Sequence, residues 1–533
     1  MGVGPMEQEE VTASAVGRRV ACDGERATVR YVGPIPPTAG LWLGVEWDHP
    51  SRGKHDGSHD GVQYFTCRHQ HGGSFVRPAK VSFGVDYVTA VRQEYKTNAD
   101  FPSEANSTIE WRIKERSFED LSSVLLGQSG VNGPGQKGAV RKLTPNVTWL
   151  DMSKSLLSCW DDVGAICLQL EKLQTLMLSY NRLSLPAEPA ALHPAFHHLS
   201  VLSLVGCDLT WLQVLECAPM WPQLEELDLL NNNITELQRP DGVLQSLKSL
   251  TLSGNPLVHH TVNTLASLCR LETLDLSKTG LSNLQFEDTR PGCQTSMFPA
   301  LTDLNLNNNN ISQWCVVDEL AKLPSLVKLH CFRNQLVSYD QNPSTTNQLI
   351  IARLEKLEFL NRTEVNLISP EIRRGAELDY IKMFGEEWLK AGGRSQISGE
   401  FILQHPRFLS LINKYGAPEE GELKKWKPPT LKNLLIKITF VFPDNMEREP
   451  IKKQLPVTME VRMVKVLLHR LLKVPLHDLR LTYISSKVRD GCRCLGFRNR
   501  VPPGQRYEDS ALLLCRGWRS GCGPLALTHQ RTV

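Results

Sequence analysis

One apolar pattern repeats through the middle of the chain and constrains its fold more than any other feature. Three full copies of the spacing L-x-x-L-x-L-x-x-N-x-L start at Leu173, Leu224 and Leu247. Variant copies complete the series and start at Val147, Leu199, Leu271, Leu301, Leu326 and Leu354. Successive copies begin 23 to 30 residues apart. A period of this length is typical of an array of stacked structural units.

The apolar positions of each copy predict one short strand followed by a less regular return segment. A single unit cannot bury its leucines, whereas stacked units share a continuous core, as leucine-rich repeats do. We therefore predict a solenoid of leucine-rich repeats over residues 147–365. The asparagine of each copy should hydrogen-bond backbone groups at the turn, which would otherwise be buried without partners.

Residues between the leucines of each strand should face the concave side of this solenoid. Four carboxylates lie at such positions, namely Glu226, Asp228, Asp275 and Asp303. They are compatible with an acidic protein-binding surface and equally with a solvated strand face. No part of the chain shows a nucleophile, a base and an orienting group in an order typical of an enzyme.

Length, charge and the distribution of apolar residues limit the number of domains and the kinds of partner. A chain of 533 residues has room for about three or four domains. A formal net charge of +3 argues against nucleic acid as the main partner. No apolar run reaches the roughly 18 residues of a membrane helix, and residues 1–10 lack the apolar core of a signal peptide. The sequence predicts a cytoplasmic protein, with no membrane partner and with reduced thiols at its 14 cysteines.

Short strands and frequent glycines between residues 16 and 83 predict a small all-β barrel. The stretch Leu41–Trp47 (LWLGVEW) is followed by Gly53–Gly57 (GKHDG) and Gly61–Phe65 (GVQYF). This set of motifs resembles a CAP-Gly domain, which we assign to residues 10–90. His55 departs from the family pattern because it occupies the position of an asparagine. A glycine-rich hairpin without a binding function is the alternative.

The resemblance to CAP-Gly domains implies recognition of an acidic peptide that ends in an aromatic residue, such as the C-terminus of α-tubulin. Gly53 and Gly57 would let the loop expose backbone amides to the terminal carboxylate, and Lys54 would supply a cation. Trp42 and Phe75 fit either the aromatic wall of the site or the barrel core. The predicted peptide site comprises Trp42, Gly53, Lys54, His55, Asp56, Gly57 and Phe75.

Neither a metal nor another cofactor is predicted. The histidines of the barrel and Cys67 lack the second ligand pair of a zinc site. The glycine-rich stretch 127–138 nearly spells a phosphate-binding loop, but Gln136 interrupts it and Gly138 replaces the Ser or Thr that binds magnesium.

Two connecting regions flank the repeats. Residues 91–146 should link the barrel to the repeats and cap the array, with a helix over 118–126 and a flexible glycine-rich loop over 127–138. Residues 366–429 carry mixed apolar and charged positions at helical spacing, so we predict a helical connector there.

The C-terminal region begins a further module. Residues 434–442 and 451–455 predict a hairpin, 458–472 an amphipathic helix, and 479–484 a third strand. This order resembles the first half of the ubiquitin-like β-grasp fold. Residues 486–533 contain nine Lys or Arg, three Asp or Glu, four Cys and no strand alternation. We therefore expect an incomplete ubiquitin-like domain over 430–485, followed by a disordered tail over 486–533.

The fold class is multidomain α+β, and the order of its modules resembles the tubulin-folding cofactor E family (tubulin-specific chaperones E) over residues 10 to about 485. The resemblance implies capture of α-tubulin, association with other tubulin-folding cofactors and β-tubulin, and assembly or disassembly of the αβ heterodimer near the cytoskeleton. The barrel would hold the tubulin tail while the repeats engage the globular body, which raises avidity. The alternatives are a microtubule-associated adaptor and an adaptor that docks on the proteasome.

Overall fold

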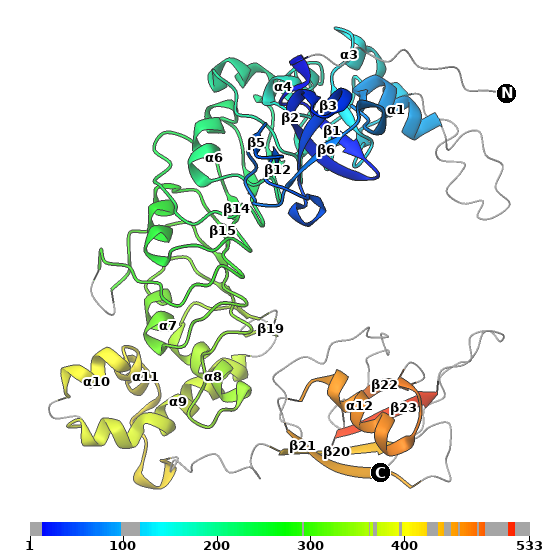
Figure 1. Ribbon diagram of the computed structural model, residues 1–533. Helices are drawn as coiled ribbons and strands as arrows, with labels where there is room; N and C mark the ends of the chain where they lie inside the picture. Colours follow the sequence, from blue (N-terminus) through cyan, green and yellow to red (C-terminus); the bar gives the residue numbers. More distant parts are fainter. Residues whose placement is uncertain are drawn as a thin grey trace. The chain divides into compact units, whose positions relative to one another are not determined.

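The computed structural model describes residues 13–96, 118–289, 293–361, 363–365, 370–393, 397–423, 435–441, 449–456, 459–476, 479–485 and 510–516. The chain divides into two units. The first consists of Met1–Gln335, Arg353–Pro370 and Leu403–Arg407, and the second of Leu336–Ala352, Glu371–Ile402 and Phe408–Val533. The N-terminal barrel and most of the repeat array belong to the first unit, and the C-terminal module belongs to the second (Figure 1).

The N-terminal barrel is built on an antiparallel sheet of order β1-β2-β3-β6. Its strands are β1 (Arg19–Cys22), β2 (Glu25–Ile35), β3 (Thr38–Trp47) and β6 (Gly73–Val76). The short strands β4 (Ser58–His59) and β5 (Val62–Gln63) form a separate hairpin. Valine and leucine side chains from three of the strands fill the core, including Val20, Val29, Leu43 and Val45, all fully buried. The predicted all-β module is confirmed.

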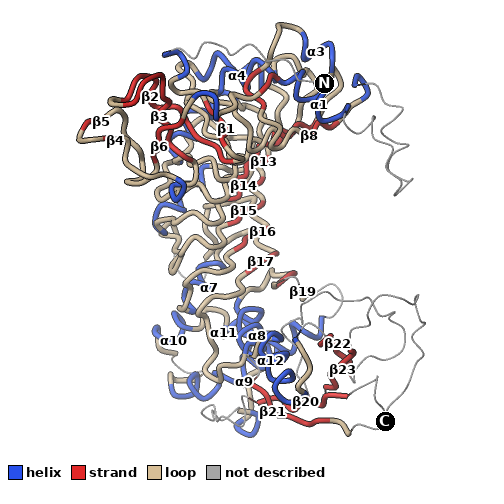
Figure 2. The backbone as a smooth tube through the Cα atoms, turned by 45° about the vertical axis from the view of Figure 1, so that its right-hand side comes forward, coloured by secondary structure: helices blue, strands red, loops and turns tan. Residues whose placement is uncertain are grey.

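The repeats form an 11-stranded sheet, parallel except for its last strand. In order these strands are β8 (Ser123–Leu125), β10 (Trp149–Asp151), β11 (Thr175–Met177), β12 (Val201–Ser203), β13 (Glu226–Asp228), β14 (Ser249–Thr251), β15 (Thr273–Asp275), β16 (Asp303–Asn305), β17 (Lys328–His330), β18 (Phe359–Leu360) and β19 (Thr363–Glu364). Each central leucine pairs in register with the next, as Leu227 does with Leu250, and is buried. Figure 2 shows the stacked strands, which confirm the predicted solenoid.

The return segments of the repeats lie on the side of the array opposite the strands (Figure 1). Several contain helices, namely α4 (Trp160–Cys167), α5 (His193–Phe196), α6 (Trp211–Cys217), α7 (Trp314–Leu320) and the 3-10 helix η7 (His259–Ser267). Helix α8 (Pro343–Arg353) follows β17 in the sequence. Trp160 of α4, Trp211 of α6 and Trp221 are fully buried. The irregular lengths of these segments account for the variable repeat period.

The repeat asparagines form the predicted ladder of backbone contacts. The side-chain amide of Asn232 donates to the carbonyls of Leu204 and Leu229 at 2.8 and 3.0 Å, and its oxygen accepts from the Leu209 amide at 3.1 Å. Asn255 accepts from the Asn232 amide at 2.8 Å, so each repeat is bonded to the next. These contacts satisfy backbone groups that are buried between repeats.

The region between barrel and repeats differs from the prediction. A helix over 118–126 is wrong, because only a 3-10 turn (Phe118–Asp120) forms before strand β8. Both Thr148 and Trp149 donate their amides to the Ser122 carbonyl, so pairing with the open edge of β10 overrides the local helical signal. Residues 127–138 are also not a flexible loop, since they contain β9 (Val131–Gly133), which pairs with β7 (Val85–Asp86). The short helices α1 (Tyr87–Lys96) and α3 (Ala139–Leu143) flank this pair.

Among the described residues between the repeats and the C-terminal module, the α-helices are α9 (Pro370–Lys390), α10 (Gly399–Gln404) and α11 (Phe408–Tyr415). The buried carboxylate of Glu377 on α9 accepts from Lys414 at 3.0 Å and from the Tyr415 hydroxyl at 2.7 Å. Paired with two donors, this carboxylate can be buried without a large penalty. Among the helices that the structure describes, none combines the length and apolar character needed to cross a membrane.

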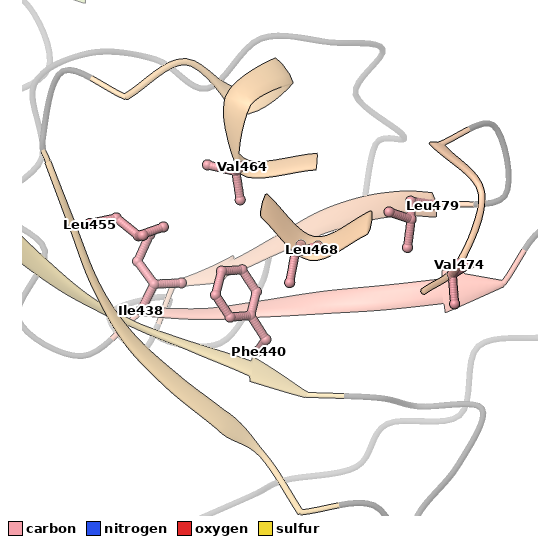
Figure 3. Packing of buried hydrophobic residues seen from close by; sticks show 7 residues of the cluster. All are labelled: Ile438, Phe440, Leu455, Val464, Leu468, Val474 and Leu479. Carbon is pink, nitrogen blue, oxygen red and sulfur yellow. The ribbon is translucent and has the colours of Figure 1, made fainter. Parts of the chain in front are cut away.

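The C-terminal module has a four-stranded sheet of order β21-β20-β23-β22. Its elements are β20 (Leu435–Val441), β21 (Ile451–Pro456), α12 (Val461–Leu472), β22 (Leu479–Ser485) and β23 (Ser510–Arg516). Figure 3 shows Val464 and Leu468 of α12 packed over Ile438 and Phe440 of β20. The predicted ubiquitin-like class is confirmed.

The expectation that residues after 485 add no strand is wrong. Strand β23 runs parallel to β20 and antiparallel to β22, and it lies between them. Its sequence, SALLLCR, contains a short continuous apolar run, which is compatible with a strand although it does not alternate. Alternation, on which the prediction relied, is expected only of a strand with one solvated face. The remainder of the predicted tail lies outside the described residues.

Candidate functional site

A groove of about 600 Å³ opens on the N-terminal barrel. Among its described lining residues are four cations, Arg52, Lys54, Arg77 and Lys80, and one carboxylate, Asp23. Trp42, Trp47 and Phe75 supply aromatic surface, and His55 and His59 supply imidazoles. The lining therefore combines positive charge with flat apolar surface, which suits an anionic ligand that carries an aromatic group.

Phe75 on β6 is the centre of an aromatic cluster. The ring of His55 stacks on it with centroids 4.7 Å apart, and Tyr64 and Phe65 approach it edge-on at 5.6 and 5.5 Å. Phe65 is buried, whereas Phe75 is only half-buried and lines the groove. Phe75 thus belongs to the wall of the groove, and Phe65 belongs to the core beneath it.

Trp42 on β3 is fixed in the groove by two contacts. Its indole nitrogen donates to the Thr38 hydroxyl at 2.9 Å, and the Arg77 guanidinium lies 3.8 Å from its ring centroid. Arg52 covers Trp47 in the same way at 4.5 Å and also pairs with Asp23 at 3.1 Å. Stacking orders the two arginines while their remaining N–H groups stay available to a carboxylate.

The glycines of the GKHDG loop have a different role from the one predicted. A Cβ on Gly53 would lie 1.9 Å from the His71 carbonyl oxygen, and one on Gly57, at φ +103°, would lie 1.9 Å from that of Phe65. The amides of Lys54 and His55 both donate to the Gly73 carbonyl, at 2.7 and 3.2 Å. Close packing, rather than exposed amides for a ligand carboxylate, therefore explains why glycine is needed here.

The predicted peptide-site residues divide into two groups. The groove brings Trp42, Lys54, His55 and Phe75 together. By contrast, Gly53, Asp56 and Gly57 lie outside its lining and shape the loop beneath it. The Asp56 carboxylate accepts from the Ser58 hydroxyl and amide at 2.5 and 3.0 Å, and these bonds lower the pKa of Asp56.

His55 supplies a hydrogen-bond acceptor to its own loop. Its Nδ1 accepts a hydrogen bond from the Gly57 amide at 3.0 Å, as an asparagine oxygen does in a turn. This bond requires an unprotonated Nδ1, so the neutral ring carries its proton on Nε2. Burial lowers the pKa of His55 from about 6.5; Asp56 partly opposes the shift, and His59 and Lys54 add to it.

The His55→Asn variant should make the stability of the barrel less dependent on pH. Below about pH 6.5 the unfolded chain takes up a proton at His55 while the folded barrel resists it, so parent stability should fall from about pH 7.5 to about pH 5.5. Asparagine keeps the acceptor for Gly57 but does not titrate. Hydrogen exchange of β3 amides, corrected for intrinsic rates, measures the difference. His69→Asn is the control, because His69 is exposed and is not among the groups that act on His55, and it should retain the parental dependence. Equal dependence in His55→Asn and the parent would contradict the prediction.

Sequence reasoning missed three groove cations, Arg52, Arg77 and Lys80. Arg77 follows Phe75 by two residues at the end of β6, and Arg52 directly precedes the GKHDG loop. Strand alternation places Arg77 and Phe75 on the same face, so this signal was available in the sequence. Lys80 lies in the 3-10 helix Pro78–Lys80, whose position the local sequence does not indicate.

The four predicted carboxylates lie on two rows of the repeat sheet, which we call the strand face. One row contains Glu226 and Asp303, and the other contains Asp228 and Asp275. Asp228 accepts from the Leu230 amide at 3.1 Å, and Asp275 accepts from the Ser277 amide at 2.7 Å. Burial, aided by Asp275, raises the pKa of Asp228, and the Leu230 bond opposes this. These two aspartates therefore support the turns as well as giving the face its charge.

Some carboxylates of the strand face also contact polar side chains of neighbouring strands. Asp275 accepts from the Asn305 amide at 2.9 Å, and Asp303 lies 3.7 Å from Nε2 of His330. Glu226 is exposed. Among the described residues, no group of three or more His, Cys, Asp or Glu is placed to hold a metal ion. The arrangement offers charge and hydrogen bonds to a protein surface.

Known proteins match both the barrel and the whole chain. Residues 16–81 match the CAP-Gly domain family. The chain is 53% identical to the tubulin-specific chaperone E of Danio rerio over 94% of this chain and 99% of that protein, and 46% identical to that of Homo sapiens over 90% and 94%. The solution structure of the C-terminal ubiquitin-like domain of mouse tubulin-specific chaperone e matches 16% of this chain and 92% of that domain at 37% identity, with a TM-score of 0.14.

Proposed function

The chain belongs to the tubulin-specific chaperone E family, and we propose that it captures α-tubulin at two surfaces, the basic groove and the strand face. It is a tubulin-folding cofactor, with a part in assembling and dismantling the αβ heterodimer. The groove would hold the acidic C-terminal peptide of α-tubulin, and the strand face would contact the globular body.

The composition of the groove is the observation that carries this proposal. Arg52, Lys54, Arg77 and Lys80 face a single carboxylate, so an acidic peptide is attracted while a basic one is repelled. A terminal carboxylate can accept charge-assisted bonds from the arginines, and an aromatic side chain can pack against Phe75 or Trp42. These contacts need no cofactor and no chemical step.

Further partners follow from the family. We propose that other tubulin-folding cofactors and β-tubulin join the complex, and that this occurs in the cytoplasm. Family membership gives no support to the alternatives of a microtubule-associated adaptor or a proteasome adaptor.

The Lys54→Ala variant should weaken binding of a peptide ending in Glu-Glu-Tyr. Loss of one charge-assisted contact costs about 1.5–3 kcal/mol, or roughly tenfold or more in affinity. Calorimetric titration of the full chain measures this, and removal of the terminal tyrosine should weaken binding as well. Lys172→Ala, which changes an exposed lysine of the repeats, is the matched control. Unchanged affinity in Lys54→Ala, with an intact circular dichroism spectrum, would refute the assignment of the groove.

Peptide titration combined with capture of whole tubulin distinguishes the contribution of the groove from that of the strand face. Asp228→Asn combined with Asp275→Asn removes two charges from the strand face but preserves acceptors for Leu230 and Ser277. This variant should bind the peptide normally and capture whole tubulin more weakly. Full capture of tubulin would mean that the strand-face carboxylates are only solvated surface.

A further inference from the structure

The N-terminal barrel is attached to the first repeats at two places that neither binding surface requires. We infer that the contact of Asp208 with Arg68 is a positioning contact, which holds the basic groove in one orientation relative to the strand face. The two surfaces then meet a single partner molecule as one composite site. This inference rests on the proposed function, but its test separates the two.

The first attachment is a short parallel β-pair. Val85 of β7 pairs with Val131 of β9, and its amide donates to the Gly130 carbonyl at 3.0 Å. The Asn132 side chain donates to the Phe83 carbonyl at 2.9 Å. Gly84 approaches so closely that a Cβ on it would lie 2.1 Å from the Gly130 oxygen. The segment leaving the barrel is thus bonded to the end of the repeat array.

Helix α1 strengthens this first attachment. Tyr87 is fully buried, and its hydroxyl hydrogen-bonds that of Thr144 at 3.0 Å. The Tyr95 hydroxyl accepts from the amide of Leu125 in strand β8 at 2.9 Å. A single attachment of this kind restricts the orientation of the barrel less than two separate attachments do.

The second attachment comes from the body of the barrel and centres on Asp208. This residue follows the asparagine position of its repeat and has a left-handed backbone, at φ 63°. One carboxylate oxygen accepts from the Asn233 side chain at 3.2 Å. The other pairs with Arg182 of the repeats at 2.6 Å and with Arg68 of the barrel. Arg68 and Asp208 are 140 residues apart in the chain.

A neighbouring contact lies on the same side of the barrel. Arg26 of β2 donates to the Lys154 carbonyl at 3.1 Å, next to the first repeat strand. The carboxylate of Asp48 is close enough to Arg182 to act on its charge, and it also pairs with the buried Arg19. The barrel is therefore held to the repeats by polar contacts at a second point, separate from the β7–β9 pair. Two separate points of attachment oppose rotation of the barrel about β7.

An exposed ion pair contributes little to folding stability, so its value here is geometric. Bivalent capture depends on effective concentration, which falls when the connection between two binding modules is loosened. Loss of the Arg68–Asp208 contact should therefore weaken capture of a whole partner and leave peptide binding in the groove unchanged.

A double-mutant cycle in the full chain tests this inference. Arg68→Ala should weaken capture of purified tubulin by about tenfold. Asp208→Ala should weaken it by at least as much, because it also removes the contacts with Arg182 and Asn233. The double variant should be no weaker than Asp208→Ala, because that variant has already lost the contact with Arg68. Small-angle X-ray scattering should show a broader distribution of intramolecular distances in each. Arg92→Ala, an exposed arginine on α1, is the matched control, and Arg68→Lys should retain most of the capture.

The outcomes are distinguishable. Unchanged capture in the single variants would overturn the inference, as would additive losses, which would mean that the two residues act independently. Weakened capture with an unchanged scattering profile would also overturn it, because Arg68 would then contact tubulin directly. Peptide affinity should equal that of the parent in every variant of the cycle. Failure of the proposed function would instead appear as a parent chain that binds no peptide.

Discussion

Deletion of residues 510–533 should unfold the C-terminal module, whereas deletion of residues 517–533 should leave it folded. Strand β23 lies between β20 and β22, with Cα pairs from Ile438–Ser510 to Val441–Leu513 on one side and from Leu479–Arg516 to Ser485–Ser510 on the other. Without β23, the strands β20 and β22 have no strand between them. The sheet then divides into the β20–β21 hairpin and the single strand β22.

The remaining contacts are too few to hold the module together. Phe440 and Leu468 are fully buried among the described core residues, and the larger deletion removes the strand next to Phe440. Ordering each residue costs about 1–2 kcal/mol, and a module of this size has little surplus stability. Loss of one central strand should therefore shift the whole module to the unfolded state.

Hydrogen exchange over residues 435–441 and 479–485 measures this effect. The parent and the shorter deletion should protect these amides, and the longer deletion should expose them to exchange. The repeats serve as an internal reference, since neither deletion touches their sheet. Protection that persists after removal of residues 510–533 would show that the module folds without β23.

The substitution Leu229→Ala should lower the free energy of unfolding of the repeat array by about 2–5 kcal/mol. Leu229 has no exposed surface, and Leu204 and Leu252 occupy the same buried position in the adjacent repeats. Its amide also donates to the Thr251 carbonyl at 2.9 Å. Truncation leaves a cavity between repeats whose backbones are bonded on both sides, so the array cannot close around it.

Urea unfolding followed by circular dichroism gives the size of this effect through the midpoint of the array transition. Leu212→Ala is the matched control, because Leu212 is the second residue of α6 and its side chain is 55% exposed. Its substitution should change the free energy by no more than about 0.5 kcal/mol. Equal midpoints for the two variants would contradict the assignment of Leu229 to the shared core.

The sequence alone predicted those parts of the molecule whose structure depends on interactions between residues close together in the chain. The leucines and asparagines recur with the repeat period, and each copy dictates the same strand and turn, so the array followed from the pattern. The barrel motifs likewise placed Lys54 and His55 on a tight loop, and the structure brings both to the groove with Trp42 and Phe75.

Local signals failed where a segment pairs with a distant one. Residues 118–126 have a helical signal, yet the open edge of β10 draws Ser123–Leu125 into a strand. The apolar run of β23 was overlooked because the prediction required alternation, whereas a short continuous apolar run can also form a strand. In the GKHDG loop, the carbonyl of Gly73 takes the amides that were expected to face a ligand.

The sequence by itself determined the modules, their order and the four groove residues Trp42, Lys54, His55 and Phe75. Tertiary structure alone decided that β23 completes a sheet, that Arg52, Arg77 and Lys80 join the groove, and that Asp208 meets Arg68. The physical reason is the range of the interactions. Periodicity and turn chemistry act within a few residues, whereas strand pairing and ion pairs depend on which distant segments the fold brings together.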